Sequence, residues 1–575
     1  MIKLFRFLKP YKLLVAAVLL LLFFQSIAEL YLPTLMSDIV DTGIVKGDIN
    51  YILRTGAFML LVAIGSAVFT ILAGFLSSRT ATSFGRDLRS RVFAQVEDFA
   101  LHEFNKIGTS SLITRTTNDI TQVQQVLVMI MRFMVTAPMM CIGGIIMAVS
   151  KDAQLSLVLV VVLPVLAAAI VIIARKGFPL FKEQQVKLDK LNLVLRENLT
   201  GIRVIRAFNR KDHEQARFTE ANSDLTGTAI RVNKLMAVTM PLMMLVMNFT
   251  TIAIIWFGGI RIDHGDMKVG AMMAFIQYAV QIMFSLLMVS FIIVMVPRGQ
   301  ASAMRINEVL ETKARIKDAA EVKNADNQKG FVEFKDVTFS YPGAEQPVIS
   351  NISFSARPGE VTAIIGGTGS GKSTLISLIP RFYDVDSGSI LVDGVDVREM
   401  AQDNLRAKIG FVPQTGILFT GTIADNIRYG KEDAAMEEVE HAAEVAQAVE
   451  FISGMPEGYA SVIAQGGTNV SGGQKQRLSI ARALIRRPEI YIFDDSFSAL
   501  DFKTDARLRA ALKKETAEAT VLIVAQRVST VMDADRIIVL DNGQITGIGN
   551  HKELITTCEV YREIVSSQLS EEEIA

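Results

Sequence analysis

Long apolar runs separated by polar segments dominate the first half of the chain. Each run is long enough to cross the hydrocarbon core of a bilayer, which is about 30 Å thick. The first run is retained as a span, because it is too long for a signal peptide and lacks a small-residue cleavage site. The pattern therefore predicts six membrane-spanning helices. They cover residues 13–33, 57–78, 129–150, 155–174, 236–258 and 271–296.

The segments between these runs differ in length and charge. Residues 79–128 and 175–235 are long, polar and rich in Arg and Lys, whereas the other connections are short. The positive-inside rule places these two segments and both termini in the cytoplasm. Both segments keep a helical periodicity, so we expect spans two to five to continue as helices below the membrane. We expect turn-like tips near 106–110 and 207–211 to dock onto a soluble domain; plain cytoplasmic loops are the alternative.

The pattern changes after the last apolar run. The membrane domain is predicted to cover 13–300, followed by a polar linker at 301–330. From 331 to 567, short β-branched runs alternate with helical stretches, which predicts an α/β domain. At the two ends we expect an amphipathic helix on the membrane surface at 1–12 and an acidic tail at 568–575. Strands are expected at 331–334, 361–365, 490–493, 521–524 and 537–540.

Composition supports a chain that is part membrane and part soluble. Half of the 575 residues are hydrophobic, and 59 basic residues balance 59 acidic ones. The mean hydropathy of +0.35 is too high for an ordinary soluble protein. The balanced charge excludes a basic nucleic-acid-binding surface as the main function. The two cysteines, Cys141 and Cys558, exclude a disulfide framework and a metal cluster built from thiols.

A glycine-rich stretch follows the apolar run 361–365 and reads GGTGSGKST. Its spacing fits the phosphate-binding pattern G-x-x-x-x-G-K-[ST] between a strand and a helix. In this pattern the backbone N–H groups and the helix N-terminus bind phosphate oxygens. Lys372 should reach the β- and γ-phosphates of a nucleotide, and Ser373 should hold Mg²⁺. The predicted nucleotide-binding residues are Gly366, Gly367, Thr368, Gly369, Ser370, Gly371, Lys372, Ser373 and Thr374.

A buried strand at 490–493 ends in Asp494. A carboxylate at this place orients Mg²⁺ and its waters in phosphate-loop ATPases. A phosphate-loop domain of this size could equally be a kinase, a GTPase or a motor, so other motifs must decide between them.

Four further motifs occur in a characteristic order. Residues 470–474, VSGGQ, resemble the signature of ATP-binding-cassette (ABC) ATPases. Tyr341 matches the adenine-stacking residue of that family, Gln414 its Q-loop glutamine, which also faces Mg²⁺, and Asp501 the end of its D-loop. The whole chain resembles a half-transporter of the bacterial multidrug ABC exporters, with the membrane domain ahead of the ATPase.

This resemblance implies ATP-driven export across the bacterial cytoplasmic membrane, with ATP and Mg²⁺ as cofactors. In such exporters two ATPase domains pair head to tail, and each ATP lies between the phosphate loop of one and the signature of the other. The signature residues that would face the partner's ATP are Ser471, Gly472, Gly473 and Gln474. The two loop tips match the coupling helices of the family.

Two residues depart from the family pattern at the hydrolysis site. Asp495 stands where the family has a catalytic glutamate, and Gln526 stands where it has the switch histidine. Gln465 also replaces a glutamate ahead of the signature, a change that can be neutral. Since the signature is intact, we expect the chain to be the degenerate-site half of a heterodimer. The partner would supply the full catalytic Glu and His.

Glu29 is the acidic residue deep in the first span, with Gln25 one turn before it. Such a residue marks either a substrate path or an interhelical hydrogen bond, and the sequence favours neither. Besides the lipid bilayer, the expected partners are hydrophobic or cationic small molecules, and no nucleic acid.

Two other functions stay open at this point. The chain could be an ATP-sensing subunit that regulates a membrane complex, an idea that the weakened catalytic residues favour and the intact signature opposes. It could also export lipids or peptides, although a peptidase-type exporter would need an N-terminal domain, for which residues 1–12 leave no room.

Overall fold

The computed structural model describes residues 1–319, 321–323 and 329–569. The chain forms two compact units. The helical unit contains Met1–Glu97 and Thr109–Thr312, and the α/β unit contains Asp98–Gly108 together with the chain from Lys313 onward. A short piece of the first long polar segment therefore packs with the α/β unit.

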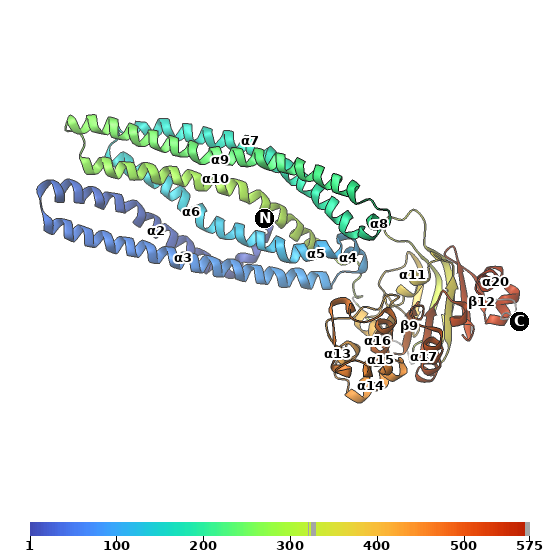
Figure 1. The fold of residues 1–575 in the computed structure, drawn as a ribbon. Coiled ribbons are helices and arrows are strands. Elements are labelled where there is room, and N and C mark those ends of the chain that lie inside the picture. The colour runs from blue at the N-terminus through green and yellow to red at the C-terminus, as the bar shows by residue number, and fades with distance from the viewer. Residues whose placement is uncertain (320, 324–328, 570–575) are drawn as a thin grey trace. The chain divides into compact units, whose positions relative to one another are not determined.

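Long helices make up the helical unit (Figure 1). Within the described residues, six helices are long and apolar enough to cross a membrane, as predicted. Its helices are α1 (Ile2–Phe5), the 3-10 helix η1 (Arg6–Tyr11), α2 (Lys12–Asp38), the π-helix η2 (Ile39–Ile44), α3 (Ile49–Glu97), α5 (Thr109–Thr114), the π-helix η3 (Arg115–Asp119), α6 (Ile120–Lys151), α7 (Leu157–Thr200), α8 (Ile202–Ala207), α9 (Lys211–Asp263) and α10 (Val269–Glu311).

Several of these helices are longer than a bilayer requires. Helix α3 has 49 residues and α9 has 53. At about 1.5 Å per residue both exceed a hydrocarbon core of about 30 Å more than twofold. The predicted continuation of the spans as polar helices is therefore present. Helix α2 packs against α3, α6 against α10, and α7 against α9 (Figure 1).

The predicted start of the linker differs from the structure. Helix α10 runs to Glu311, so the linker predicted from residue 301 begins too early. The reason is burial: Ala303, Ile306 and Val309, spaced one helical turn apart, are fully buried. Residues 320 and 324–328 of that linker lie outside the described residues. The same is true of 570–575 in the predicted acidic tail.

The predicted amphipathic helix at 1–12 is short in the structure, since η1 follows α1 and α2 begins at Lys12. Each predicted loop tip is preceded by a short helix, which is α4 (Leu101–Ile107) for the first tip and α8 for the second.

Within the described residues, the α/β unit contains two larger sheets and a small one. The strands are β1 (Val332–Phe339), β2 (Ile349–Ala356), β3 (Val361–Gly366), β4 (Ser387–Val392), β5 (Val395–Asp396), β6 (Ile409–Val412), β7 (Gly421–Thr422), β8 (Val462–Ile463), β9 (Ile490–Asp494), β10 (Thr520–Val524), β11 (Arg536–Asp541) and β12 (Gln544–Gly549). Their order is β2-β1-β4-β5 in one sheet, β12-β11-β3-β10-β9-β6 in the second, and β7-β8 in the third.

Helices flank the sheets of the α/β unit. They are α4, α11 (Lys372–Ser377), α12 (Gln402–Ala407), α13 (Ile423–Arg428), α14 (Met436–Val445), α15 (Val449–Ser453), the 3-10 helices η4 (Gly458–Ala460) and η5 (Gln465–Gly467), α16 (Gly472–Leu484), α17 (Phe502–Glu515), α18 (Val528–Val531), α19 (His551–Thr557) and α20 (Glu559–Ser566).

The six-stranded sheet separates two hydrophobic cores. Alternate residues of each strand enter opposite cores: Phe493 and Ile523 lie in one, and Ile492 and Leu522 in the other. Strands β11, β3, β10, β9 and β6 are mutually parallel. Loops that leave the carboxyl ends of neighbouring parallel strands gather at one edge of a sheet, where ligands bind in open α/β folds.

Candidate nucleotide-binding site

The phosphate loop connects β3 to α11 and requires glycine at several positions. Gly369 has φ +85° and Gly371 has φ +95°, conformations that strain other L-residues. A Cβ atom on Gly366 would lie 2.1 Å from the backbone oxygen of Leu540 on the neighbouring strand. Gly366, Gly369 and Gly371 are therefore needed by the loop itself. This geometry leaves the N-terminus of α11 facing the loop.

Lys372 lies at the first position of α11 and is largely buried. Its Nζ donates hydrogen bonds to the backbone oxygens of Gly366 at 2.8 Å and Gly367 at 2.7 Å. Burial lowers the pKa of the Lys372 ammonium, and the carboxylates of Asp495 and Asp494 oppose that shift. Phosphate oxygens would replace two neutral acceptors with charged ones, which accept stronger hydrogen bonds from an ammonium.

The residues predicted to hold Mg²⁺ are partly brought together. Ser373 Oγ donates to Asp494 Oδ1 at 2.8 Å. Burial raises the pKa of the Asp494 carboxyl; the charge of Asp495 adds to the shift, while the Ser373 hydrogen bond and Lys372 oppose it. A hydroxyl and a carboxylate are the oxygen donors that suit Mg²⁺ beside nucleotide phosphates. Among the described residues, no group of three or more His, Cys, Asp or Glu could hold a metal ion.

Two side chains from neighbouring strand ends converge on Asp495. Asp495 Oδ2 accepts hydrogen bonds from Gln414 Nε2 at 3.2 Å and from Gln526 Nε2 at 3.0 Å. Gln414 follows β6, Asp495 follows β9 and Gln526 follows β10. The structure thus joins the predicted Q-loop and switch residues at Asp495, whereas Gln414 was predicted to face Mg²⁺.

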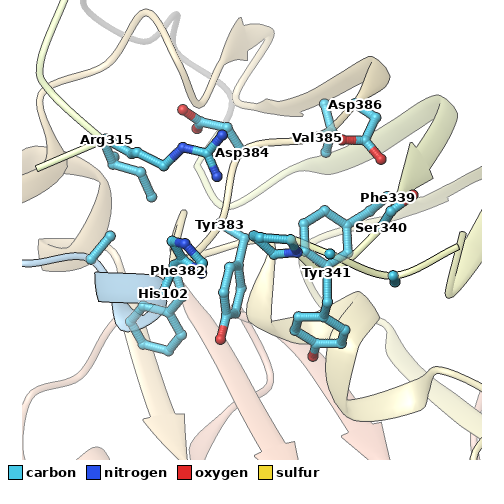
Figure 2. Close-up of a pocket in the computed structure, with 15 residues that line it drawn as sticks. His102, Arg315, Phe339, Ser340, Tyr341, Phe382, Tyr383, Asp384, Val385 and Asp386 are labelled. Atoms are coloured by element: carbon cyan, nitrogen blue, oxygen red, sulfur yellow. The ribbon is translucent and has the colours of Figure 1, made fainter. Parts of the chain in front are cut away.

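Tyr341, the predicted adenine-stacking residue, lines a cavity of about 640 Å³. Figure 2 shows Tyr341 and Tyr383 close together, and their ring centroids lie 5.4 Å apart in a perpendicular arrangement. The Tyr341 hydroxyl lies 3.0 Å from Thr374 Oγ1 in α11, which connects this cavity to the phosphate loop. An aromatic ring at such a place can stack on a planar base.

Sequence reasoning missed three residues that line this cavity, namely His102, Arg315 and Tyr383 (Figure 2). His102 lies on α4, just ahead of the first predicted tip. None of the three belongs to a local sequence motif. They line the cavity because the folded chain brings them close to Tyr341.

The signature residues form the start of α16. Ser471 caps this helix: its Oγ accepts from the backbone N–H of Gln474 at 3.3 Å, and Gln474 Oε1 accepts from the backbone N–H of Ser471 at 2.8 Å. Ser471 and Gly472 are exposed, and a Cβ atom on Gly472 would meet no atom within 4 Å. Asp501 caps α17 by accepting from Thr504 N–H at 2.9 Å.

Comparison with known proteins decides the family. Residues 15–286 match the family described as "ABC transporter transmembrane region", and residues 349–498 match the one described as "ABC transporter". An uncharacterized ABC transporter ATP-binding protein of Mycobacterium tuberculosis is 45% identical over 97% of both chains. The chain belongs to the ABC transporters.

This ABC transporter has further relatives. It is 31% identical to the ATP-dependent lipid A-core flippase of Chromobacterium violaceum, over 95% of this chain and 93% of the flippase. The solved structure of a bacterial Atm1-family ABC exporter with ATP bound has the same fold, with a TM-score of 0.81 and 24% identity over 97% of this chain and 99% of that one.

Several predictions are thereby confirmed. The protein is a multi-pass membrane protein in which a six-helix membrane domain is fused to an α/β ABC ATPase domain that binds ATP. As a member of the ABC transporters, it couples an ATPase domain to transport across a membrane.

Glu29 and Gln25 lie together in the helical unit. Gln25 Nε2 donates to Glu29 Oε1 at 3.1 Å within α2, and Gln281 Nε2 of α10 donates to the backbone oxygen of Glu29 at 3.4 Å. Because both acceptors on Glu29 are oxygens, the two amide nitrogens must point at them. Gln25 Oε1 and Gln281 Oε1 are buried without a partner in the described residues. The Glu29 carboxylate therefore bonds within α2, and the bond from α10 reaches only the backbone oxygen of Glu29. An interhelical bond of this carboxylate and a substrate path both stay predictions.

Proposed function

We propose that this chain is one half of a heterodimeric exporter and that its own ATP site binds ATP firmly but hydrolyses it poorly. The phosphate loop, Asp494 and Tyr341 supply the groups that binding needs. Asp495 and Gln526 replace the two residues that the family uses for hydrolysis.

The contacts of Asp495 carry this proposal. Its side chain is one methylene shorter than glutamate, and its Oδ2 is already engaged by the amides of Gln414 and Gln526. A carboxylate held in this way reaches less far toward an attacking water. In catalysis by positioning, a misplacement of 1 Å can cost about a hundredfold in rate. Gln526 can donate a hydrogen bond to the γ-phosphate, but an amide cannot carry a proton as imidazole does.

The signature supports the second half of the proposal. The exposed start of α16, with its intact Ser471, Gly472, Gly473 and Gln474, would complete the ATP site of a partner subunit. That partner would have the full catalytic Glu and His. An ATP-sensing subunit would have no use for a signature of this kind.

The proposed cargo is a drug or another amphiphilic compound. The apolar helical unit, the acidic Glu29 beside Gln25, and the resemblance to a lipid A-core flippase favour a molecule with apolar parts and hydrogen-bond donors. A cationic group would be attracted strongly by a carboxylate at low dielectric.

The decisive experiment is reconstitution of the chain alone and together with a neighbouring half-transporter, followed by steady-state ATPase measurement. We expect weak turnover for the chain alone and strong turnover for the pair. Replacing the catalytic glutamate of the partner by glutamine should then abolish most of the turnover of the pair. Robust turnover of this chain as a homodimer would contradict the proposal.

A further inference from the structure

The segment after the C-terminal helix α20 contacts the loop that bears Gln526. The side-chain amide of Gln568 makes two hydrogen bonds to that loop. Its Nε2 donates to the backbone oxygen of Gln526 at 2.9 Å, and its Oε1 accepts from the backbone N–H of Val528 at 2.9 Å. One amide therefore pairs with the backbone groups on both sides of Arg527. We call residues 526–528 the switch segment.

The C-terminal segment itself is firmly anchored. Tyr561 and Val565 of α20 are fully buried in the hydrophobic core that also contains Val528 and Val531. Leu569, directly after Gln568, is partly buried against the same core. Gln568 is exposed, yet its backbone is fixed on both sides by packing. The amide is thus presented to the switch segment from a rigid base.

The side chains of the switch segment contact the candidate ATP site and the D-loop, residues 498–501. Gln526 Nε2 donates to Asp495 Oδ2, as described above. The Arg527 guanidinium donates to the backbone oxygens of Ser498 at 2.9 Å and Leu500 at 3.4 Å. It also lies 5.3 Å from the ring centroid of Phe502, within the range of a cation–π contact. A displacement of this backbone would move both side chains together.

We propose that Gln568 is a positioning residue for ATP hydrolysis. Its amide fixes the backbone of the switch segment, so that Gln526 stays on Asp495 and Arg527 stays on the D-loop. Both side-chain hydrogen bonds of Gln568 go to the switch segment, and the residue acts through that segment. This role belongs to the last turns of the chain, outside every family motif named above.

Amide hydrogen exchange of the full-length transporter tests the proposal directly. In Q568A, residues 526–529 should exchange about tenfold faster, which corresponds to about 1.4 kcal/mol, because the variant removes both side-chain hydrogen bonds to this segment. The melting temperature should stay unchanged because Gln568 is exposed. Q568E keeps the acceptor for Val528 but loses the donor for Gln526, so it should lie between Q568A and the wild type. The matched control is S567A, whose hydroxyl bonds only the Ile564 carbonyl of its own helix.

ATP turnover supplies the second readout. We expect kcat of Q568A to fall by about threefold to tenfold with a smaller change in KM for ATP, because most groups expected to bind the nucleotide belong to the phosphate loop and to Tyr341. If the transporter is a heterodimer, turnover is measured with the partner's phosphate-loop lysine replaced, so that it belongs to this chain's site. Unchanged exchange in Q568A, equal acceleration in S567A, or an unchanged kcat would each overturn the proposal. The exchange readout is taken on this chain and does not depend on the heterodimer proposal.

Discussion

The phosphate loop and the neighbouring ends of β9 and β10 are built in different ways. The loop is held by backbone geometry: Gly369 and Gly371 adopt positive φ angles, and a side chain on Gly366 would collide with a neighbouring strand. The strand ends instead place two side chains, Asp495 and Gln526, that are joined by a hydrogen bond. Asp495 has φ +46°, a conformation that aspartate tolerates better than most residues. A side chain at Gly366, Gly369 or Gly371 would disturb the loop, whereas substitution of Asp495 or Gln526 changes the chemistry.

This difference explains how binding and hydrolysis can separate within one site. The groups expected to bind phosphate are mostly backbone N–H groups, together with the buried Lys372. The N–H groups are retained as long as the loop keeps its conformation. The groups that activate water depend on the length and proton-carrying ability of side chains. Substitutions there leave a folded, nucleotide-binding domain.

Lys372→Ala tests nucleotide binding and should have the largest effect of the proposed variants. It should weaken ATP binding at this chain's site by about a hundredfold, since charge-assisted hydrogen bonds are worth up to about 3 kcal/mol. In a heterodimer, turnover at the partner's site should persist in part. Site-resolved photolabelling with an ATP analogue measures this, with the exposed Lys552→Ala as control. Complete loss of labelling at both sites would contradict independent sites.

Gly472→Asp tests the signature. We expect the turnover of the pair to fall by about thirtyfold, because a carboxylate would face the partner's ATP and like charges in such contacts cost several kcal/mol. Since the space around Gly472 is open in this chain, its own fold should be unaffected. Gly472→Ala controls for the loss of glycine and should retain most of the turnover. Unchanged turnover in Gly472→Asp would remove the signature from the partner's site.

Asp495→Glu and Gln526→His test the two residues that we propose limit ATP hydrolysis. Each change alone should restore little turnover in the chain's own site, because catalytic residues that act as a unit are strongly non-additive. The double variant should exceed either single variant by about tenfold, within the range of general acid–base effects. Steady-state ATPase of the pair with the partner's site silenced gives the comparison. Full ATPase activity of the Asp495→Glu variant alone would show that Gln526 does not limit hydrolysis.

Glu29→Gln tests the predicted substrate path in the helical unit. Removal of the charge should lower the transport of cationic substrates by about threefold and leave neutral substrates nearly unchanged, because only cations gain from a carboxylate at low dielectric. The amide can still accept from Gln25. Transport assays with a charged and an uncharged substrate of similar size give the ratio. Equal effects on both would assign Glu29 a structural role.

Asp494→Asn should have the smallest effect, on stability. Burial raises the pKa of this carboxyl in the folded protein. Its ionised form therefore costs stability at neutral and alkaline pH, and this cost fades as the pH falls toward the unfolded pKa. The variant should raise the melting temperature of the nucleotide-free protein by about 2 °C at pH 8 and by less at pH 5. Equal shifts at both pH values would rule out ionisation as the cause.

The local patterns of the sequence determined the elements. Apolar runs of sufficient length predicted the six spans, and β-branched runs predicted strands close to the observed β1, β3, β9, β10 and β11. The spacing of glycines and Lys372 predicted the phosphate loop. Each of these depends on neighbours within a few residues, so the chain itself carries the information.

Only the tertiary structure decided which distant residues meet. Gln414 and Gln526 share one oxygen of Asp495 because β10, β9 and β6 lie side by side in the sheet. Gln568 reaches the switch segment across 40 residues, and His102 joins the cavity at Tyr341 from α4. The burial of Ala303, Ile306 and Val309 extends α10 past its apolar run. These contacts follow from strand order and helix packing, which local periodicity does not encode.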